Sequence, residues 1–438
     1  MNLSAKPSVA RRFAPALDLS RGNPKEHSTG AIARWLAHRL LSAARNPPIS
    51  IVLWNSEEVP SKAPRPSVGR IVLRTRRALF RLLMDPEFQF GELYSSGELE
   101  IDGDLLSVLE ALYRKYASGD GFVSYLPRWL DRSAFNSLGR ARENIHHHYD
   151  IGNEFYRLWL DDRMLYTCAY FARAGMTLED AQLAKMEHVC RKLRLQPGET
   201  VVEAGCGWGS LALFMARQHG VKVRAFNISR EQIALARERA QKEQLDHLVE
   251  FVEDDYRNIS GKYDAFVSVG MLEHVGPSRF AEVGEVIDRA LKPHGRGLIH
   301  TIGRHVPMKT TSWITRRIFP GARPPALSEM MRIFEPRSFA VQDVENLRLH
   351  YAETLAHWLA RFDAHQDDVR QMFDESLVRA WRLYLAGSLA AFTTGWMQLY
   401  QVVFNRVTSN HVTRTREHLY APAVVDAAPR EEPALGKV

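Results

Sequence analysis

The stretch that decides the fold is Thr200-Val201-Val202-Glu203-Ala204-Gly205-Cys206-Gly207-Trp208-Gly209-Ser210. Its first half is a short apolar run with β-branched residues, which is typical of a buried parallel strand. The glycines that follow allow a turn in which the backbone passes very close to a ligand. Because residues 210–217 then read as a helix, the order is strand, glycine turn and helix. This order predicts the nucleotide-binding corner of an open α/β sheet.

The spacing of the glycines narrows the choice of ligand. Gly205, Gly207 and Gly209 form G-x-G-x-G and not the dinucleotide pattern G-x-G-x-x-G, and no Gly-Lys-Ser/Thr follows to hold a triphosphate. A glycine turn without a phosphate-neutralising lysine favours a ligand that lacks phosphates, such as S-adenosylmethionine. A tight turn with a purely structural role is the alternative that the motif alone leaves open.

Strands and helices alternate through the middle of the chain with short connections. Strands are predicted at residues 201–204, 221–226, 249–252, 265–269 and 297–301, and helices at residues 178–193, 210–218, 230–244 and 280–291, the last two capped by Ser229 and Ser278. Such alternation predicts a doubly wound, mainly parallel sheet. Later strands at residues 339–344 and 396–404, with helices at 354–362 and 369–392 between them, are expected to add an antiparallel edge.

The remaining chain predicts a small accessory domain and several connecting segments. Residues 31–119 have the pattern of an α+β domain, with helices at 31–41 and 78–83, strands at 49–54 and 67–73, and an acidic turn within 90–106 that leads into a further helix. Residues 1–30 and 407–438 are expected to be tails, with disorder expected over 1–30 and 421–438. Residues 120–142 form a basic, aromatic linker, either a helix that touches a membrane or a solvated hinge.

Composition limits the partners and the compartment. The 438 residues carry a formal net charge of +7, so an acidic partner is expected, either nucleic acid or an anionic membrane. No apolar run is long enough to cross a membrane and no secretory signal is recognisable, which predicts a cytoplasmic protein. The three cysteines lack C-x-x-C spacing, and the histidines at 146–148 are adjacent, so their side chains diverge on a helix; no metal site is expected.

Separated blocks of sequence carry a family resemblance. They are ENI (143–145), HYDIGN (148–153), YTCAYF (166–171), EAGCGWG (203–209), VGMLEHVG (269–276), HTIG (300–303), HYAETL (350–355) and YQVVF (400–404). Together they resemble the cyclopropane-fatty-acyl-phospholipid synthases and the related mycolic acid cyclopropane synthases. The resemblance implies a Rossmann-like methyltransferase sheet with a helical insert over residues 143–406, preceded by the accessory domain, and it implies S-adenosylmethionine as the cofactor.

The resemblance also implies which residues bind this cofactor. Tyr166 and Thr167 match the pair at its amino-acid end, and Asp255 matches an acidic contact to the adenine amine. Asn227 stands where the family often has threonine, and no acidic residue there supports recognition of the ribose by a carboxylate. The full implied set is Tyr166, Thr167, Glu203, Gly205, Gly207, Gly209, Asn227, Ser229, Gln232 and Asp255.

The catalytic residues implied by the resemblance form a bicarbonate site. They are Cys168, Glu273, His300, the Ile302 backbone and Tyr351. Attack of a cis double bond on a sulfonium methyl leaves a carbocation, which closes to a cyclopropane only after the transferred methyl loses a proton. A base must therefore lie beside a cation in a dry pocket. Candidate aromatic linings are Tyr170, Phe171, Trp208, Phe319 and Tyr384.

The expected substrate is an unsaturated phospholipid in a membrane whose anionic inner face attracts the basic protein. The N-terminal domain or the basic insert at residues 313–325 is expected to form the lip of an acyl channel, and a homodimer is possible by family likeness. A methylene or methyl-branched product and a small-molecule N-methyltransferase are the alternatives within the same fold. An inactive lipid-binding protein is the alternative from another class, and the sequence has no base pocket typical of nucleic-acid methylation.

Overall fold

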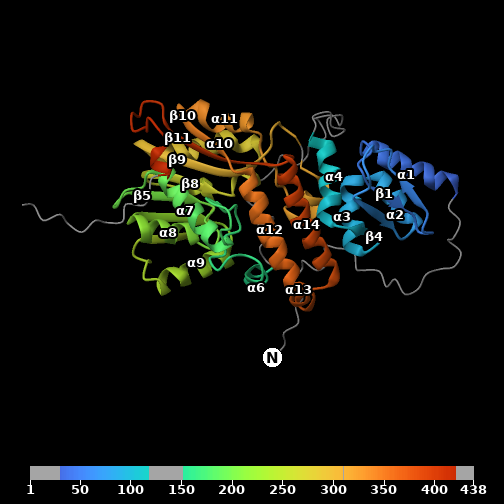
Figure 1. Cartoon of the computed structure of the whole chain (residues 1–438). Helices are drawn as coiled ribbons and strands as arrows, with labels where there is room; N and C mark the ends of the chain where they lie inside the picture. Colours follow the sequence, from blue (N-terminus) through green and yellow to red (C-terminus); the bar gives the residue numbers. More distant parts are fainter. Residues whose placement is uncertain (1–29, 118–150, 309, 421–438) are drawn as a thin grey trace, which may run out of the picture.

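The computed structural model describes residues 30–117, 151–308 and 310–420. The basic linker, the adjacent histidines at 146–148 and most of both predicted tails lie outside these residues. Figure 1 shows a small N-terminal domain beside a larger domain built on one sheet, with long helices between the two.

Seven strands form the large sheet, in the order β10-β11-β9-β8-β5-β6-β7. The strands from β9 to β7 are parallel, whereas β11 pairs antiparallel with both β9 and β10. The predicted doubly wound sheet and its antiparallel edge are therefore confirmed. The strands are β5 (Thr200–Ala204), β6 (Lys222–Asn227), β7 (Val249–Glu253), β8 (Tyr263–Val269), β9 (Leu291–Gly303), β10 (Phe339–Asn346) and β11 (Gln398–Arg406).

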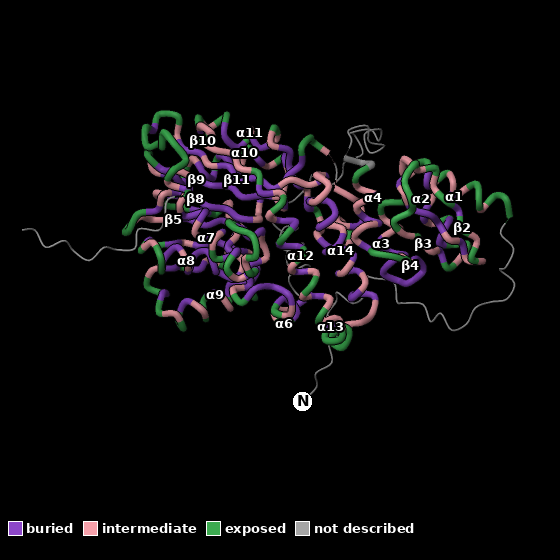
Figure 2. Tube along the Cα trace, in the orientation of Figure 1, coloured by how far each residue is buried: buried purple, intermediate pink, exposed green. Residues whose placement is uncertain are grey.

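Helices cover both faces of this sheet. Successive strand residues point to opposite faces, so Val201 packs in one apolar cluster and Val202 in another. The first cluster includes α7 (Leu178–Leu193), α8 (Ser210–His219) and α9 (Arg230–Lys242), and the second includes α10 (Phe280–Ala290) and α11 (Leu327–Phe334). In Figure 1, α8 and α9 lie below the sheet and α10 and α11 above it. Figure 2 shows the strands buried between these layers.

The predicted helix caps are half right. The Ser229 side chain accepts a hydrogen bond from the Gln232 backbone and caps α9 as predicted. Ser278 does not cap α10, because it lies inside a short 3-10 turn, Pro277–Arg279, that runs directly into the helix. That turn leaves no extended residue at the position from which a serine side chain caps a helix.

The N-terminal domain contains a four-stranded sheet in the order β2-β1-β3-β4. The predicted acidic turn at residues 90–106 is wrong, because that segment contains the end of a helix and a strand. Asp85 caps the helix at Phe88, and Gly97 ends it in the left-handed conformation. The elements are α1 (Ala31–Ala43), β1 (Ser50–Val52), β2 (Glu58–Pro60), β3 (Gly69–Leu73), α2 (Arg76–Met84), α3 (Pro86–Ser96), β4 (Leu99–Gly103) and α4 (Leu105–Ala117).

Long C-terminal helices join the two domains. They are α12 (Arg348–Ala364), α13 (Gln366–Met372) and α14 (Glu375–Thr394), so the predicted helix at 369–392 is broken where Asp374 caps α14. One apolar core runs through the N-terminal domain, α12 and α14. Arg379 of α14 donates to the Tyr94 carbonyl at 2.6 Å and pairs with Glu100 at 3.0 Å. The N-terminal domain is therefore packed against the helices that, as described below, line the site.

The first part of the predicted C-terminal tail is structured. The short helix α15 (Glu417–Tyr420) packs on α7, where Leu419 is buried. The Arg191 guanidinium donates to the Leu419 carbonyl at 3.4 Å. Residues 407–420 thus extend the larger domain.

Candidate active site

The glycine turn after β5 faces a cavity on one side and packed side chains on the other. Gly205, Gly207 and Gly209 have φ values of +85°, +54° and +82°. A Cβ on Gly209 would lie 2.5 Å from the Phe251 ring and one on Gly205 would lie 2.9 Å from Met271, whereas one on Gly207 would meet nothing within 4 Å. Gly207 therefore presents open backbone to the cavity. Gly205 and Gly209 are glycine because a side chain would not fit at either position.

Two adjoining cavities lie beneath this turn. They share Gly205, Asn227, Met271 and His274. We call the two cavities together the polar site. Eight of the ten predicted cofactor residues line it: Tyr166, Thr167, Glu203, Gly205, Gly207, Asn227, Gln232 and Asp255. Gly209 and Ser229 do not line it, since Gly209 packs against Phe251 and Ser229 serves as the cap of α9.

Hydrogen bonds hold the polar side chains of this site in place. Asn227 donates to the Gln232 side chain at 2.7 Å and to the Gly207 carbonyl at 3.3 Å, so it ties β6 to the glycine turn. At the other end, both carboxylate oxygens of Asp255 accept from the Arg257 guanidinium at 2.8 Å. These two hydrogen bonds fix the orientation of the Asp255 side chain where it lines the cavity.

Lys185 of α7 is a polar-site residue that the sequence analysis missed. Its ammonium donates to the Thr167 hydroxyl at 2.9 Å, and it lines the same cavity as Glu203. Burial lowers the pKa of Lys185 to about 8, and burial raises the pKa of Glu203 to about 8, while attraction between the two charges opposes both shifts. The Oε2 atom of Glu203 has no hydrogen-bond partner in the described part of the chain.

A signal for Lys185 was present in the sequence. Within the predicted helix at 178–193, it shares a face with Ala181 and Val189, which are both buried. A lysine in the middle of an apolar helix face is a candidate for a buried functional charge.

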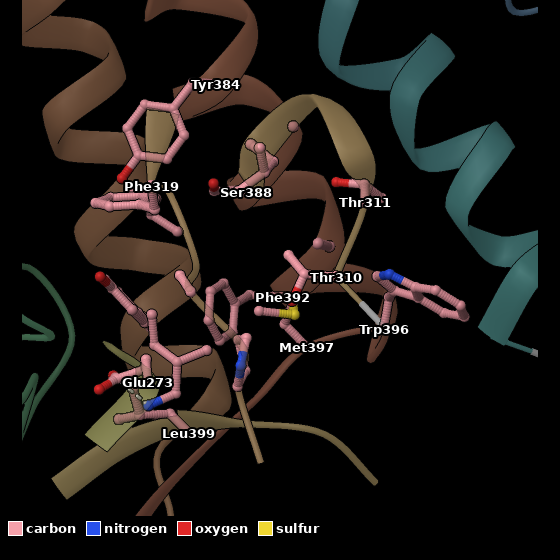
Figure 3. Close-up of a pocket in the computed structure, with 18 of the residues that line it drawn as sticks. Glu273, Thr310, Thr311, Phe319, Tyr384, Ser388, Phe392, Trp396, Met397 and Leu399 are labelled. Atoms are coloured by element: carbon pink, nitrogen blue, oxygen red, sulfur yellow. Dashed lines mark hydrogen bonds between the residues drawn. The ribbon is translucent and has the colours of Figure 1, made fainter. Parts of the chain in front are cut away.

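Next to the polar site lies a further cavity, which we call the large cavity. Its volume is about 220 Å³, and it is lined mainly by apolar side chains. It meets the polar site at Tyr166, Thr167, Gly270 and His274, which line both. All five residues predicted to be catalytic line this cavity: Cys168, Glu273, His300, Ile302 and Tyr351. In Figure 3, Glu273 lies at the lower left beside Leu399, and Phe319 and Tyr384 lie at the top of the view.

Glu273 follows β8 in a single 3-10 turn, Leu272–His274, and is buried. Its Oε1 atom accepts a hydrogen bond of 2.7 Å from the Ile302 backbone, and its Oε2 atom has no partner among the described residues. Burial raises the pKa of Glu273 to about 7, and the Ile302 hydrogen bond limits the rise. The backbone N–H of Ile302 thus orients Glu273, which is a more specific role than the sequence predicted for it.

His300 lies near the end of β9, directly opposite Gln401 of β11 in the strand register. Gln401 Nε2 lies 3.0 Å from His300 Nδ1, so Nδ1 accepts and the neutral ring carries its proton on Nε2. That Nε2 atom is buried and has no partner in the described structure. Burial, together with Lys185 and Lys192, holds the pKa of His300 well below its usual value. His300 is therefore a neutral hydrogen-bond donor.

Cys168 and Tyr351 complete the group. The Cys168 thiol lies 3.1 Å from the Ala169 carbonyl, and burial raises its pKa, so it stays protonated. Tyr351 extends from α12, and its ring packs against Phe392 with centroids 4.6 Å apart. Neither geometry is that of an activated nucleophile.

The aromatic lining differs in part from the prediction. Phe319 and Tyr384 line the large cavity, and the Tyr384 hydroxyl lies 2.8 Å from that of Tyr166. Trp208 lines the polar site instead. Tyr170 and Phe171 line neither, because Tyr170 stacks between His188 and His350 and Phe171 stacks on His357.

Both segments expected to form a lip contribute to the large cavity. Phe90 and Gly91 of α3 and Tyr113 of α4 line it from the N-terminal domain. The predicted insert at 313–325 contributes Trp313, Ile314, Phe319, Ala322 and Pro324. The two are joined by Arg317, which pairs with Glu92 at 2.5 Å, and by Trp313, whose ring occupies the space next to Gly91.

The described residues offer neither a cluster of metal ligands nor a membrane-spanning helix. Across residues 30–117, 151–308 and 310–420 no group of three or more His, Cys, Asp or Glu side chains is placed to hold a metal ion. Within the same residues, no helix is both long enough and apolar enough to cross a membrane.

The chain has clear relatives. A family model described as mycolic acid cyclopropane synthetase matches residues 136–402, and one described as a domain of unknown function matches residues 36–120. The chain is 35% identical to a probable fatty acid methyltransferase of Pseudomonas putida, over 81% of this chain and 91% of the relative. It is 36% identical to the cyclopropane-fatty-acyl-phospholipid synthase of Escherichia coli (strain K12), over 75% and 86%. Among solved structures, mycolic acid cyclopropane synthase CmaA1 complexed with SAH and CTAB has a TM-score of 0.58 and 28% identity, over 60% of this chain and 98% of that one.

Proposed function

We propose that this chain, which belongs to the mycolic acid cyclopropane synthetase family of S-adenosylmethionine-dependent methyltransferases, converts cis double bonds of phospholipid acyl chains into cyclopropane rings. One observation carries the proposal. The polar site beneath the glycine turn and the large apolar cavity meet at Tyr166, Thr167, Gly270 and His274. A polar donor and an apolar acceptor could therefore touch at a single point.

The polar site fits the proposed donor. Gly207 leaves open space for close approach, and the unpartnered Glu203 Oε2 and the Lys185 ammonium suit the amine and carboxylate of an amino acid. A related structure was solved with SAH, which is S-adenosylmethionine without its methyl group. When bound, S-adenosylmethionine supplies an electrophilic methyl group on a sulfonium.

The acceptor side requires a base, and we propose bicarbonate held by Glu273 and His300. The alkene electron pair forms a bond to the methyl carbon while the carbon–sulfur bond breaks, and one proton of that methyl must leave before the ring closes. The neutral His300 Nε2–H can donate to an anionic oxygen, and Glu273 Oε2 can accept from its hydroxyl. Both atoms are buried without other partners among the described residues, which supports a small anion there.

The apolar lining protects the cation. Phe319 and Tyr384 present aromatic rings, and their centroids lie 5.5 Å apart in an edge-to-face arrangement. Burial lowers the pKa of His274 to about 4, so this imidazole next to Phe319 stays neutral and does not repel a cation. Aromatic faces stabilise positive charge while excluding water that would quench it.

We also propose that the substrate is taken from a bilayer with an anionic surface by a cytoplasmic protein. The formal charge of +7 supports attraction to such a surface, and the cavity is large and mainly apolar. A methylene or methyl-branched product would need only a different proton or hydride to move. It is the alternative outcome, because the Pseudomonas relative is a probable fatty acid methyltransferase.

The experiment is incubation of the purified chain with S-adenosylmethionine and vesicles of mono-unsaturated phosphatidylethanolamine, followed by mass spectrometry of the acyl chains. A cyclopropane product supports the proposal, a branched or methylene product supports the alternative, and no modification refutes both. Repeating the assay in CO₂-free buffer, with and without added bicarbonate, tests the base separately.

A further inference from the structure

The end of the large cavity remote from Glu273 contains a buried arginine that the proposed chemistry does not use. In Figure 3, Glu273 lies at one end of the cavity, and Trp396 and Thr311 lie at the other. Arg304, which directly follows β9, lines the cavity with 3% of its surface exposed. It reaches the Trp396 end, because its guanidinium donates to the Trp396 carbonyl at 3.3 Å.

The positive charge of Arg304 is incompletely satisfied. Its guanidinium lies over the Trp396 ring, with 5.2 Å from the guanidinium carbon to the ring centroid. Its Nε atom is buried without a partner, and no carboxylate of the described residues lies within ion-pairing distance of it. Burial lowers the pKa of Arg304 to about 10, so it remains charged at neutral pH. Glu87 attracts this charge from a distance, but a buried charge that no carboxylate contacts directly is costly, and an anionic ligand would offset that cost.

Hydroxyl groups close to the arginine in sequence are also unpartnered. Thr310 lines the cavity, and its Oγ1 atom is buried with no hydrogen-bond partner in the described part of the chain. The Oγ atom of Ser312 is in the same state. Arg304 and Thr310 both line this cavity, whereas Ser312 does not, and a guanidinium together with a hydroxyl donor is a common set of contacts to phosphate oxygens.

We propose that Arg304 and Thr310 form a subsite for the phosphodiester of a phospholipid, which selects phospholipids over acyl lipids that lack phosphate. This inference rests on the proposed function and names the part of the substrate that the cavity reads. Arg304 follows Ile302 by two residues and Trp396 precedes β11, so the subsite lies just beyond the last paired residues of β9 and β11. An anchor at a fixed distance from the base would also select which double bond reaches it.

The order of charges at this end fits a zwitterionic headgroup. Glu87 of α3 also lines the cavity and is more exposed than Arg304, which is buried. Desolvation of the Glu87 carboxyl raises its pKa, and a hydrogen bond from the Ser312 backbone and attraction to Arg304 limit the rise. In phosphatidylethanolamine the phosphate lies nearer the acyl chain than the amine does. The phosphate would meet Arg304 inside the cavity, and the amine would meet Glu87 at the mouth.

The test compares lipids that share one oleoyl chain and differ at the polar end: oleoyl-lysophosphatidylethanolamine, mono-oleoylglycerol and oleate. Binding of each is measured by calorimetry on the full chain with SAH present, and turnover is measured with S-adenosylmethionine. The variants are Arg304→Met, Arg304→Lys and, as a matched control, Arg316→Met, whose exposed guanidinium lies over Phe88 outside the cavity lining.

We expect the wild-type protein to bind the lysophospholipid at least tenfold more tightly than mono-oleoylglycerol, because hydrogen bonds to charged groups are worth that much or more. Arg304→Met should weaken binding of the lysophospholipid alone and so abolish this preference. Arg304→Lys should retain part of the preference, and Arg316→Met should retain all of it. Equal wild-type affinities, an equal loss for both lipids in Arg304→Met, or oleate binding as tight as the lysophospholipid would overturn the proposal. If the binding preference is found but no lipid is methylated, the subsite stands and the proposed reaction fails.

Discussion

Replacing Glu273 with glutamine should make the protein more stable and much less active at the same time. The Gln Oε1 atom can still accept from the Ile302 backbone, so the local geometry is kept. What is lost is a carboxylate whose pKa burial raises from its ordinary 4.5 to about 7. Each tenfold difference in proton affinity is worth about 1.4 kcal/mol, so ionised Glu273 costs the folded protein ~3 kcal/mol above pH 7.

The sign of the effect follows from which state loses its proton first. Below pH 4.5 Glu273 is protonated in both the folded and the unfolded chain and carries no penalty. Between pH 4.5 and 7 the unfolded chain ionises first, so the wild-type protein loses stability as pH rises. The stability advantage of Glu273→Gln should therefore grow by about 2 kcal/mol between pH 5 and pH 8.

Urea unfolding followed by tryptophan fluorescence in bicarbonate-free buffer measures this difference. Glu238→Gln, at an exposed position of α9, is the matched control and should show no such growth with pH. In the vesicle assay Glu273→Gln should lower turnover by about 10²–10⁴-fold, the range for a residue of proton-transfer machinery, with SAH affinity unchanged. A variant no more stable than wild type at pH 8, or one that keeps full turnover, would refute the reasoning.

Three further substitutions test other parts of the site. Lys185→Met should weaken SAH binding about tenfold by calorimetry, since a charge-assisted hydrogen bond is lost, and an unchanged affinity would remove Lys185 from the donor site. Gly209→Ala should lower the free energy of unfolding by about 3 kcal/mol, because its Cβ would overlap the Phe251 ring at a positive φ; a stable variant would contradict this packing. Gly91→Ala should displace Trp313, 2.3 Å from the new Cβ, and reduce lipid turnover while SAH binding is kept; equal losses of both would show a global effect.

The fold could be read from the sequence where local signals and tertiary packing agree. The helix at residues 178–193 was predicted at its observed bounds, because Thr177 caps it and its apolar face is regular. The helix α3 was missed because its buried side includes Glu92, Ser95 and Ser96, which are usually exposed. Only the packing of α3 against α14 makes that polar face an interior one.

The residues of the site that lie at the ends of strands could be predicted from the sequence. Glu273 and His300 follow or end parallel strands beside the glycine turn, which is where open α/β sheets place their chemistry. Cys168 and Tyr351 were predicted by family resemblance alone. Arg304 was missed because its position in the cavity depends on a contact with Trp396. Trp396 is distant in sequence and comes close only when β11 pairs with β9.

That late pairing has a consequence for the order of events during synthesis. The predicted cofactor residues lie between Tyr166 and Asp255, and Pro320 is the last residue that lines the polar site, so all of these residues are made before the chain reaches α14 and β11. Tyr384 and Gln401, by contrast, emerge near the end of translation. His300 therefore gains its Gln401 hydrogen-bond partner only when the last strand, β11, docks against β9. A chain that ended after residue 375 would contain every residue that lines the polar site, and also Glu273, His300 and Tyr351, but it would lack Tyr384 and Gln401.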